Sequence, residues 1–318
     1  MKMNTEHIEF SHVSVLLDEC IDSLNIQPNL TYVDCTTGGG GHSYEIAARL
    51  TEGGRLICLD RDETALRAAS ERLAPFSDRV EFVHANFNEI GRVLDERGVE
   101  NLGGVLADLG CSSYQFDTPE RGFSYQHSAP LDMRMDTDAP LDAHTVVNEY
   151  PEEALRRIIF EYGEERFASK IAGKIVAARE KAPIETTAEL SEIICSAIPK
   201  EARRGGPHPA KRTFQAIRIE VNAELDAISP MIEAAAARLV KGGRLALISF
   251  HSLEDRIVKQ SYAKLASGCE CPRDFPICVC GKKPTVEILS RKPILPGENE
   301  LIINPRSRSA KLRVAKKL

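Results

Sequence analysis

Four consecutive glycines, residues 38–41, constrain this 318-residue chain more than any other feature. They follow residues 30–34 (LTYVD), which predict a strand, and they precede a helical pattern over residues 43–50. A strand, a glycine turn and a helix together form a unit that cradles nucleotides. The glycines let the backbone approach a ligand closely, while N–H groups of the helix point at it. The sequence therefore predicts an α/β sheet with a nucleotide-type ligand at this turn.

The ends of the next strands refine the ligand class. Asp60 follows the strand predicted at residues 55–59, the position from which an acid reaches a ribose diol. NAD enzymes and S-adenosylmethionine (SAM) methyltransferases share this layout. SAM is favoured because Asp34 precedes the glycines, where it would repel a pyrophosphate but suit a cationic ligand, and because the spacing is not GxGxxG. Phe87, after a third predicted strand at residues 80–84, either packs on the purine ring or is a core aromatic.

A long polar stretch follows the short apolar strand predicted at residues 105–107. Asp108 ends that strand, where an open α/β sheet places its chemistry. A long irregular segment inside a compact domain is typical of a functional loop. We therefore interpret residues 103–136 as the floor of an active site that leads into a second domain.

Residues 143–199 carry only helical patterns, and the strand pattern returns at residues 244–250. An all-helical block between βα units indicates an inserted domain. One long helix is predicted over residues 214–239. Residues 286–289 and 311–314 are predicted to close the sheet as an antiparallel pair.

Charge and composition exclude few classes of function. The net charge is −6, but basic residues gather at 200–218 and 306–317, either as phosphate contacts or as solvated faces. No apolar stretch approaches membrane-spanning length, and residues 1–10 lack the apolar core of a signal peptide. We therefore expect a cytoplasmic location and no membrane partner, with the cysteines reduced.

Several longer motifs occur along nearly the whole chain. They are residues 12–17 (HVSVLL), 34–42 (DCTTGGGGH), 108–115 (DLGCSSYQ), 121–124 (RGFS), 130–136 (PLDMRMD), 162–165 (YGEE), 214–219 (FQAIRI) and 250–256 (FHSLEDR). In this order they resemble the MraW-like family of bacterial 16S rRNA (cytosine-N4)-methyltransferases. The signal is far more specific than any single glycine motif.

The resemblance implies a class I SAM-dependent methyltransferase fold, a Rossmann-like sheet interrupted by an all-helical substrate-recognition domain. The domain boundaries that we predict are 1–112 and 212–318 for the methyltransferase domain and 113–211 for the insert. The implied activity is N4-methylation of one cytidine in the decoding region of 16S rRNA. Two alternatives are a SAM methyltransferase acting on DNA or a small molecule, and a non-catalytic ribosome assembly factor.

The resemblance also implies a set of cofactor contacts. They are Gly40, Gly41, His42, Asp60, Phe87, Asp108 and Gln115. The residue patterns had independently indicated the glycine turn, Asp60, Phe87 and Asp108.

The exocyclic amine of cytosine is a poor nucleophile because its lone pair is delocalised into the ring, so methylation at N4 requires catalysis. Hydrogen-bond acceptors must hold its N–H groups and align the nitrogen with the methyl donor. We predict that Asp108, or backbone carbonyls beside it, accepts from the amine, and that Ser112 and Ser113 shape the pocket. The competing role for Asp108 is only to hold SAM.

The expected partner is 16S rRNA within the small ribosomal subunit, which stacking and phosphate contacts would recognise. Tyr114 or Phe123 is the candidate stacking surface. The candidate RNA contacts are Arg134, His208, Lys211, Arg212 and Arg218. Each can instead be a residue of a domain interface, and for the arginines the two readings are equal. The sequence leaves the oligomeric state open, a homodimer included.

Four clustered cysteines form two CxC pairs separated by six residues. They are Cys269, Cys271, Cys278 and Cys280. Four thiolates can hold a tetrahedral structural zinc ion, although CxxC is the commoner spacing. The alternative is a loop of reduced, exposed thiols.

Overall fold

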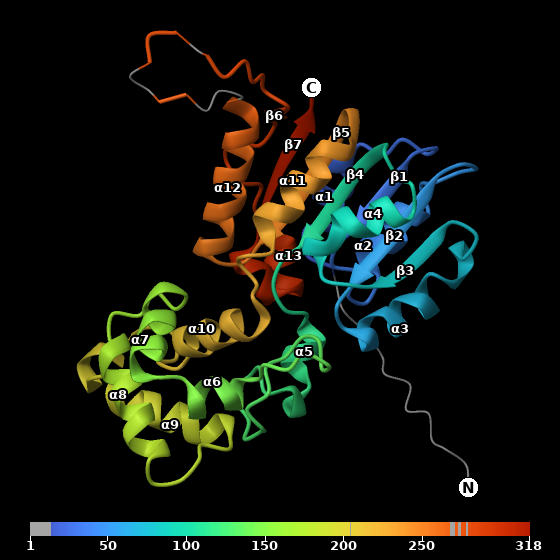
Figure 1. The fold of residues 1–318 in the computed structure, drawn as a ribbon. Coiled ribbons are helices and arrows are strands. Elements are labelled where there is room, and N and C mark those ends of the chain that lie inside the picture. Colours follow the sequence, from blue (N-terminus) through green and yellow to red (C-terminus); the bar gives the residue numbers. More distant parts are fainter. Residues whose placement is uncertain (1–13, 204, 268–270, 273–274, 278) are drawn as a thin grey trace, which may run out of the picture. The chain divides into compact units, whose positions relative to one another are not determined.

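The chain forms two compact units in a computed structural model that describes residues 14–203, 205–267, 271–272, 275–277 and 279–318 (Figure 1). The first, called the sheet unit, comprises the described parts of Met1–Gly110 and Asp226–Leu318. The second, called the helical unit, is Cys111–Leu225. The helical unit is therefore an insertion into the chain of the sheet unit.

Within the described residues, seven strands form one sheet in the order β3-β2-β1-β4-β5-β7-β6. Neighbouring strands are parallel from β3 to β5, whereas β7 is antiparallel to both β5 and β6. The strands are β1 (Thr31–Asp34), β2 (Arg55–Asp60), β3 (Val80–His84), β4 (Leu102–Asp108), β5 (Leu239–Ser249), β6 (Val286–Ile288) and β7 (Lys311–Lys317). The predicted antiparallel closing pair is confirmed.

Helices of the sheet unit surround this sheet. They are α1 (Leu17–Leu24), α2 (Gly41–Ala47), α3 (Glu63–Arg72), α4 (Ile90–Glu96), α11 (Ile228–Arg238), α12 (Ser252–Ser267) and α13 (Glu298–Ile303). Leu24, Ile46 and Ala69 bring α1, α2 and α3 into one buried core with the strands. Helix α11 packs against both α4 and α12. The central strand β4 is buried along Val105, Leu106 and Ala107, as a strand covered on both faces must be.

The helical unit has its own apolar core. Its helices are α5 (Ser113–Asp117), α6 (Ala143–Glu149), α7 (Glu152–Glu161), α8 (Ala168–Arg179), α9 (Thr187–Ala197) and α10 (Lys211–Asn222). Leu155 and Ile159 of α7 face Ile171 and Ile175 of α8 in that core, four residues apart in each helix. Thr186 and Glu189 form a capping box at the start of α9, as the sequence pattern indicates.

The structure corrects the predicted domain boundaries and the long helix at residues 214–239. The second boundary lies at Leu225/Asp226 rather than 211/212, because Phe214 and Ile217 of α10 belong to the helical core. The first boundary lies after Gly110 rather than after residue 112. The predicted helix is two helices, α10 and α11.

The break between α10 and α11 lies where the chain bonds to a distant loop. Ala223 adopts the left-handed conformation, with φ of 47°, which ends α10. The side chain of Asn222 donates to the carbonyl of Met133 at 2.7 Å and accepts from the N–H of Met135 at 2.8 Å. These bonds tie the end of α10 to a distant loop of the helical unit, which helical periodicity alone does not reveal.

The predicted fold class, a Rossmann-like α/β sheet with an inserted helical block, is confirmed. The segment after Asp108, which the sequence indicates as irregular, contains the short helix α5. No helix in the described part of the chain is long and apolar enough to cross a membrane.

Candidate functional site

Three carboxylates end neighbouring parallel strands of the sheet unit. Asp34, Asp60 and Asp108 are the last residues of β1, β2 and β4. Because these strands run in the same direction, their carboxyl ends meet at one edge of the sheet. This edge is the candidate site, and the three acids differ in how their oxygens are used.

Asp34 braces the glycine turn. One carboxylate oxygen accepts from the N–H of Thr36 at 3.1 Å, and the other accepts from the hydroxyl of Ser43 at 2.6 Å. Its side chain is only 1% exposed, and burial raises its pKa to about 6. The acid that the sequence indicates as partner of a cationic ligand is therefore engaged by the turn and by α2.

Asp60 holds the same turn from the neighbouring strand. Its oxygens accept from the N–H groups of Gly38 at 2.8 Å and Asp62 at 2.9 Å. Burial raises the pKa of Asp60 to about 6. Each carboxylate oxygen keeps acceptor capacity beyond one bond, so the predicted contact with a ribose diol stays a prediction.

The glycines of the turn serve different neighbours. Gly38 and Gly40 have φ of 51° and 76°, a backbone conformation that residues other than glycine rarely adopt. A methyl group at Gly40 would lie 3.2 Å from Cβ of Ala69 in α3, and one at Gly41 would overlap the hydroxyl of Ser14. Beside Gly38, by contrast, the nearest neighbour would be the carbonyl oxygen of Thr36 at 3.9 Å. The open side of the turn is therefore at Gly38.

His42 in α2 has a buried side chain with a protein partner. Its Nε2 lies 3.0 Å from the carbonyl oxygen of Val15, and burial lowers its pKa to about 4. The ring is therefore neutral near pH 7, and Nε2 carries the hydrogen because a carbonyl can only accept. The backbone N–H of His42, near the start of α2, and the Nδ1 of its ring are the groups left for a contact with a cofactor.

Phe87 begins a short 3-10 helix, Phe87–Glu89, after β3. Its side chain is 7% exposed, and this turn packs against α11. The ring therefore contacts protein over most of its surface. The predicted contact with a purine remains a prediction.

Within the described part of the chain, Asp108 is the one of the three acids with a buried oxygen that accepts no hydrogen bond. Its backbone N–H donates to the Thr36 hydroxyl at 2.6 Å, which fixes the end of β4 against the glycine turn. Its Oδ1 is buried and has no hydrogen-bond partner among the described residues. Burial, together with the charges of Asp34, Glu254 and Glu300, raises the pKa of Asp108 well above its usual range. A buried acceptor without a partner is costly, which points to a ligand that donates to it or is positively charged.

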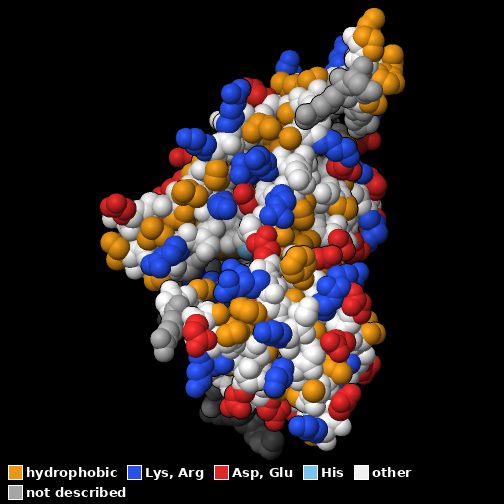
Figure 2. Space-filling model, turned by 90° about the vertical axis from the view of Figure 1, so that its left-hand side faces the viewer, with side chains coloured by type: hydrophobic (Ala, Val, Ile, Leu, Met, Phe, Trp, Pro, Cys, Tyr) orange, Lys and Arg blue, Asp and Glu red, His pale blue; other side chains and the backbone are white. Residues whose placement is uncertain are grey.

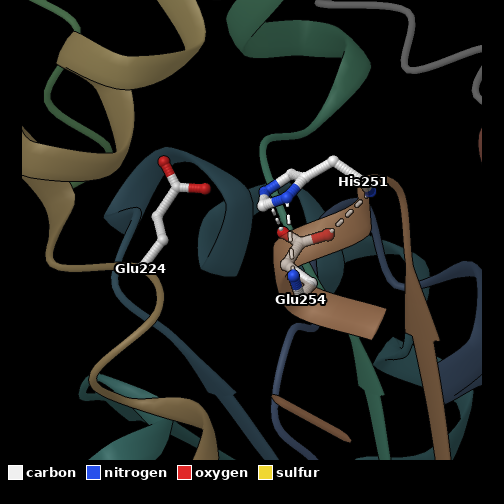
Figure 3. Close-up of side chains that lie close together, drawn as sticks. All are labelled: Glu224, His251 and Glu254. Atoms are coloured by element: carbon white, nitrogen blue, oxygen red, sulfur yellow. Dashed lines mark hydrogen bonds and ion pairs between the residues drawn. The ribbon is translucent and has the colours of Figure 1, made fainter. Parts of the chain in front are cut away.

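Sequence reasoning missed the buried pair His251 and Glu254 at the exit of β5 (Figure 3). Glu254 is 1% exposed and accepts from the N–H groups of Phe250 at 2.8 Å and His251 at 3.2 Å. Its other oxygen lies 3.1 Å from Nε2 of His251. His251 directly precedes α12, and Glu254 follows it by three residues, which is the spacing of a capping box. This spacing is the signal by which the sequence could have indicated the pair.

In the helical unit, two predicted site residues build the start of α5. Ser112 Oγ accepts from the N–H of Gln115 at 3.3 Å, and Gln115 Oε1 accepts from the N–H of Ser112 at 3.1 Å. Ser113 is the first residue of the helix. Ser112 and Gln115 thus form a reciprocal cap, while their predicted contacts with ligands remain predictions.

Arg134 is engaged by an acid of its own unit. Its Nε and Nη2 donate to the two oxygens of Asp132 at 2.9 and 2.8 Å, and its Nη1 donates to the carbonyl of Ala139 at 3.0 Å. These bonds stiffen the loop before α6. The geometry favours a positioning role for this guanidinium over a direct contact with RNA.

Arg218 also pairs with an acid of its own unit, and this pair is more buried than that of Arg134. Its Nε and Nη2 donate to the two oxygens of Glu224, each at 2.9 Å, and its Nη1 donates to Cys111 Sγ at 3.0 Å. The side chains of Arg218 and Glu224 are 13% and 4% exposed. This bidentate pair joins both ends of the helical unit, since Cys111 begins it and Glu224 lies just before its last residue.

The other three predicted RNA contacts lie on the surface of the helical unit. His208, Lys211 and Arg212 are all exposed. The ring of His208 stacks on Tyr125 with centroids 4.5 Å apart, and Arg212 donates to the carbonyl of Glu164 at 2.9 Å. Figure 2 shows lysine and arginine side chains interspersed with acidic ones on the face toward the viewer. The exposed cations are more available to phosphate than Arg134 and Arg218 are.

The predicted zinc ligands are only partly described. Cys269 and Cys278 lie outside the described residues. Cys271 Sγ accepts from the N–H of Val279 at 3.4 Å. The arrangement of the four thiols, Cys280 included, therefore stays a prediction.

Comparison with known proteins gives one consistent result. Residues 9–318 match the model of the MraW methylase family. Ribosomal RNA small subunit methyltransferase H of Clostridioides difficile is 56% identical over 311 residues, covering 98% of this chain and 100% of that protein. The protein of the same name from Symbiobacterium thermophilum is 58% identical over 309 residues, covering 97% of each chain.

Solved structures are more distant. The crystal structure of an rRNA methylase from Streptococcus thermophilus is 13% identical, with a TM-score of 0.41, over 95% of this chain and 93% of that one. The match of the family model and the full-length relatives together show that the chain belongs to the MraW methylase family.

Proposed function

We propose that this protein transfers a methyl group from SAM to N4 of a cytidine in the 16S rRNA of the small ribosomal subunit. Family membership and the names of its full-length relatives support the reaction class and the ribosomal substrate. The structural observation that carries the proposal is the buried Oδ1 of Asp108 beside the glycine turn, which has no hydrogen-bond partner within the described residues. The N4 position, and the decoding region as its location, rest on the resemblance of the sequence motifs.

The edge of the sheet fits the cofactor. The open space at Gly38 suits a ligand that approaches the backbone, and Asp60 Oδ atoms keep acceptor capacity for hydroxyl groups. Asp108 offers an acceptor and negative charge. When bound, SAM supplies an electrophilic methyl group on a positively charged sulfur. Gly40, Gly41, His42, Phe87 and Gln115 complete the proposed set of cofactor contacts.

Asp108 is the proposed acceptor for the cytosine amine. A hydrogen bond from N–H to a carboxylate holds the amine in one orientation and takes up positive charge that develops on nitrogen. Only the ionised carboxylate can accept in this way, and a nearby positive charge favours ionisation of a buried acid. Ser112 and Ser113 are proposed to shape the pocket for the base.

The helical unit is the proposed RNA-recognition part. The exposed side chains of His208, Lys211 and Arg212 are suited to stacking and phosphate contacts. Arg134 and Arg218 support this surface by organising the loops and helix ends around it. The small ribosomal subunit as partner would place the reaction in the cytoplasm.

Transfer of tritium from labelled SAM tests this function. Isolated small subunits, naked 16S rRNA, DNA and no nucleic acid are compared, and the labelled nucleoside is identified after digestion. We expect label in N4-methylcytidine with small subunits or rRNA. Label in DNA would favour the alternative DNA enzyme. Binding of subunits with no transfer to any substrate would favour a non-catalytic assembly factor.

A structural zinc ion held by Cys269, Cys271, Cys278 and Cys280 remains a separate proposal, based on the spacing of the two CxC pairs. Elemental analysis of protein purified without chelator tests it. One zinc ion per chain is expected, with loss in the Cys271→Ser variant. Absence of stoichiometric zinc in the wild type would exclude the site.

A further inference from the structure

The segment of residues 14–16, here called the strap, has no role in the site described so far. It belongs to the HVSVLL motif of the sequence. The Ser14 hydroxyl occupies the space that a side chain at Gly41 would need. Since Gly41 is the first residue of α2, the strap lies directly against the glycine turn.

The strap is held in an unfavourable conformation. Leu16 has φ of 52° and adopts the left-handed conformation, although its side chain is completely buried. A residue other than glycine pays about 1–2 kcal/mol for this backbone geometry. Such a conformation persists only where neighbouring contacts determine it, so the contacts of the strap are informative.

Two side chains anchor the strap from outside. His42 donates from Nε2 to the carbonyl of Val15 at 3.0 Å. Glu300 Oε1 accepts from the N–H of Leu16 at 2.9 Å, a contact between residues 284 apart in the sequence. The carbonyl of Leu16 then accepts from the N–H of Cys20 within α1. The anchors thus come from α2 on one side and from α13 on the other.

Both anchors adjoin the candidate site. His42 is the second residue of the helix that follows the glycine turn. Glu300 is close enough to Asp108 for its charge to act on that carboxyl group. The strap is therefore bonded both to the helix that follows the glycine turn and to α13.

We propose that Glu300 is a positioning residue that holds the strap against the glycine turn through the N–H of Leu16, and that the strap thereby sets the affinity for the nucleoside cofactor. This inference rests on the proposed function, since it presumes a nucleoside ligand at the turn. Glu300 acts as a hydrogen-bond acceptor and not through its charge. The C-terminal helix α13 thus contributes to cofactor binding without touching the reacting atoms.

Two substitutions at Glu300 separate these roles in the full-length protein. Glu300→Ala removes the acceptor, whereas Glu300→Gln removes the charge and keeps an oxygen that can accept. Glu298→Ala, in an exposed residue of the same helix, is the matched control. S-adenosylhomocysteine is titrated calorimetrically into each ligand-free variant, and kcat is measured at saturating SAM.

For Glu300→Ala we expect up to about tenfold weaker binding of S-adenosylhomocysteine, as for loss of one hydrogen bond, with kcat little changed. Glu300→Gln should bind within about threefold of the wild type, and Glu298→Ala should match it. Hydrogen exchange in the ligand-free protein should be faster at the N–H of Leu16 in Glu300→Ala only.

Other outcomes overturn the proposal. Wild-type binding in Glu300→Ala would show that the strap does not set affinity, and unchanged exchange at Leu16 would show that Glu300 does not hold it. Equal weakening in Glu300→Gln and Glu300→Ala would assign the effect to charge. A wild type that binds S-adenosylhomocysteine but methylates no RNA would refute the proposed function and leave the Glu300 result standing.

Discussion

Asp108 of the sheet unit and Arg218 of the helical unit are both charged, both largely enclosed by protein, and both singled out by sequence motifs. Their hydrogen bonding differs. Asp108 leaves a buried oxygen without a partner among the described residues, whereas Arg218 uses three nitrogens on Glu224 and Cys111. A group with unused capacity is available to a ligand, while a group that its neighbours already satisfy holds the fold.

The contrast extends to the other residues of each unit. The carboxylate oxygens of Asp34 and Asp60 accept hydrogen bonds from residues in and beside the glycine turn. These two acids therefore fix the conformation of the turn next to Asp108. In the helical unit, Lys211 and Arg212 are exposed and so have access to a phosphate. The four predictions below test this division between ligand-binding and fold-stabilising charges, beginning with the largest expected effect.

Asp108→Asn should lower kcat at saturating SAM by about 10³-fold, within the range for loss of a positioned proton acceptor. Asparagine has nearly the same shape but cannot carry the negative charge. Single-turnover methyl transfer and calorimetric SAM binding measure the two roles separately. Asp78→Asn, in an exposed residue, is the control. Unchanged turnover with weaker SAM binding would restrict Asp108 to holding the cofactor.

Arg218→Ala should destabilise the helical unit by about 3 kcal/mol, because it leaves the buried Glu224 carboxylate without its cation. Urea denaturation followed by circular dichroism measures the change. Arg156→Ala, in an exposed pair with Glu153, should alter stability little. If the Arg218→Ala variant were as stable as the wild type and lost only RNA binding, Arg218 would be a ligand-binding residue. That result would contradict the contrast drawn between Asp108 and Arg218.

The affinity for SAM should rise by about tenfold between pH 5 and pH 7. This is the increase expected if SAM binding releases about one proton over roughly one pH unit of that interval. In the free protein the pKa of Asp34 and of Asp60 is raised to about 6 by burial, so both hold protons below that pH. A cationic ligand prefers the ionised acids, and binding therefore releases protons and strengthens as pH rises through 6. His42, whose pKa burial lowers to about 4, stays neutral over this range.

Calorimetry in two buffers of different ionisation enthalpy counts the protons in that experiment. S-adenosylhomocysteine lacks the positive sulfur and should show a shallower dependence. The stability of the ligand-free protein should change with pH in the opposite direction from its affinity for SAM. Carboxyl groups with raised pKa stabilise the folded state below about pH 4, and that contribution is lost as pH rises through 6. Proton uptake on SAM binding would contradict the assignment.

Replacing Lys211 and Arg212 together by alanine should weaken RNA binding by a few-fold and reduce the salt slope by about 1.4, or about 0.7 for each lost phosphate contact with a single strand. Stability should not change, because both side chains are exposed. Filter binding across a salt series measures the slope. The double replacement of Lys170 and Lys174, exposed in α8, is the control. An unchanged slope would remove Lys211 and Arg212 from the RNA surface.

Much of the sheet unit was predictable because its signals are local. Strand β3 has the predicted bounds, since a short β-rich run depends on residues close in the sequence. Asp34, Asp60 and Asp108 were expected at one edge because parallel strands bring their carboxyl ends together. The pair His251 and Glu254 was missed because it was read as part of a motif and not as a helix cap.

Other features depend on contacts between distant residues. The helix predicted over residues 214–239 breaks at Ala223, where Asn222 bonds to the loop of Met133 and Met135. Arg218 looks like a free cation in the sequence because nothing there shows that its guanidinium lies against Cys111, 107 residues earlier.

The sequence by itself determined the class of fold, the family, and the residue types at the edge of the sheet, because strands, caps and turns follow from local stereochemistry and periodicity. Only the tertiary structure decided which charges are free to bind. The bonds of Glu300 to Leu16 and of Arg218 to Cys111 join segments far apart in the chain, and the buried oxygen of Asp108 has no partner among the residues that the structure describes. Burial and pairing depend on that packing, and they decide whether a charged side chain serves the fold or a ligand.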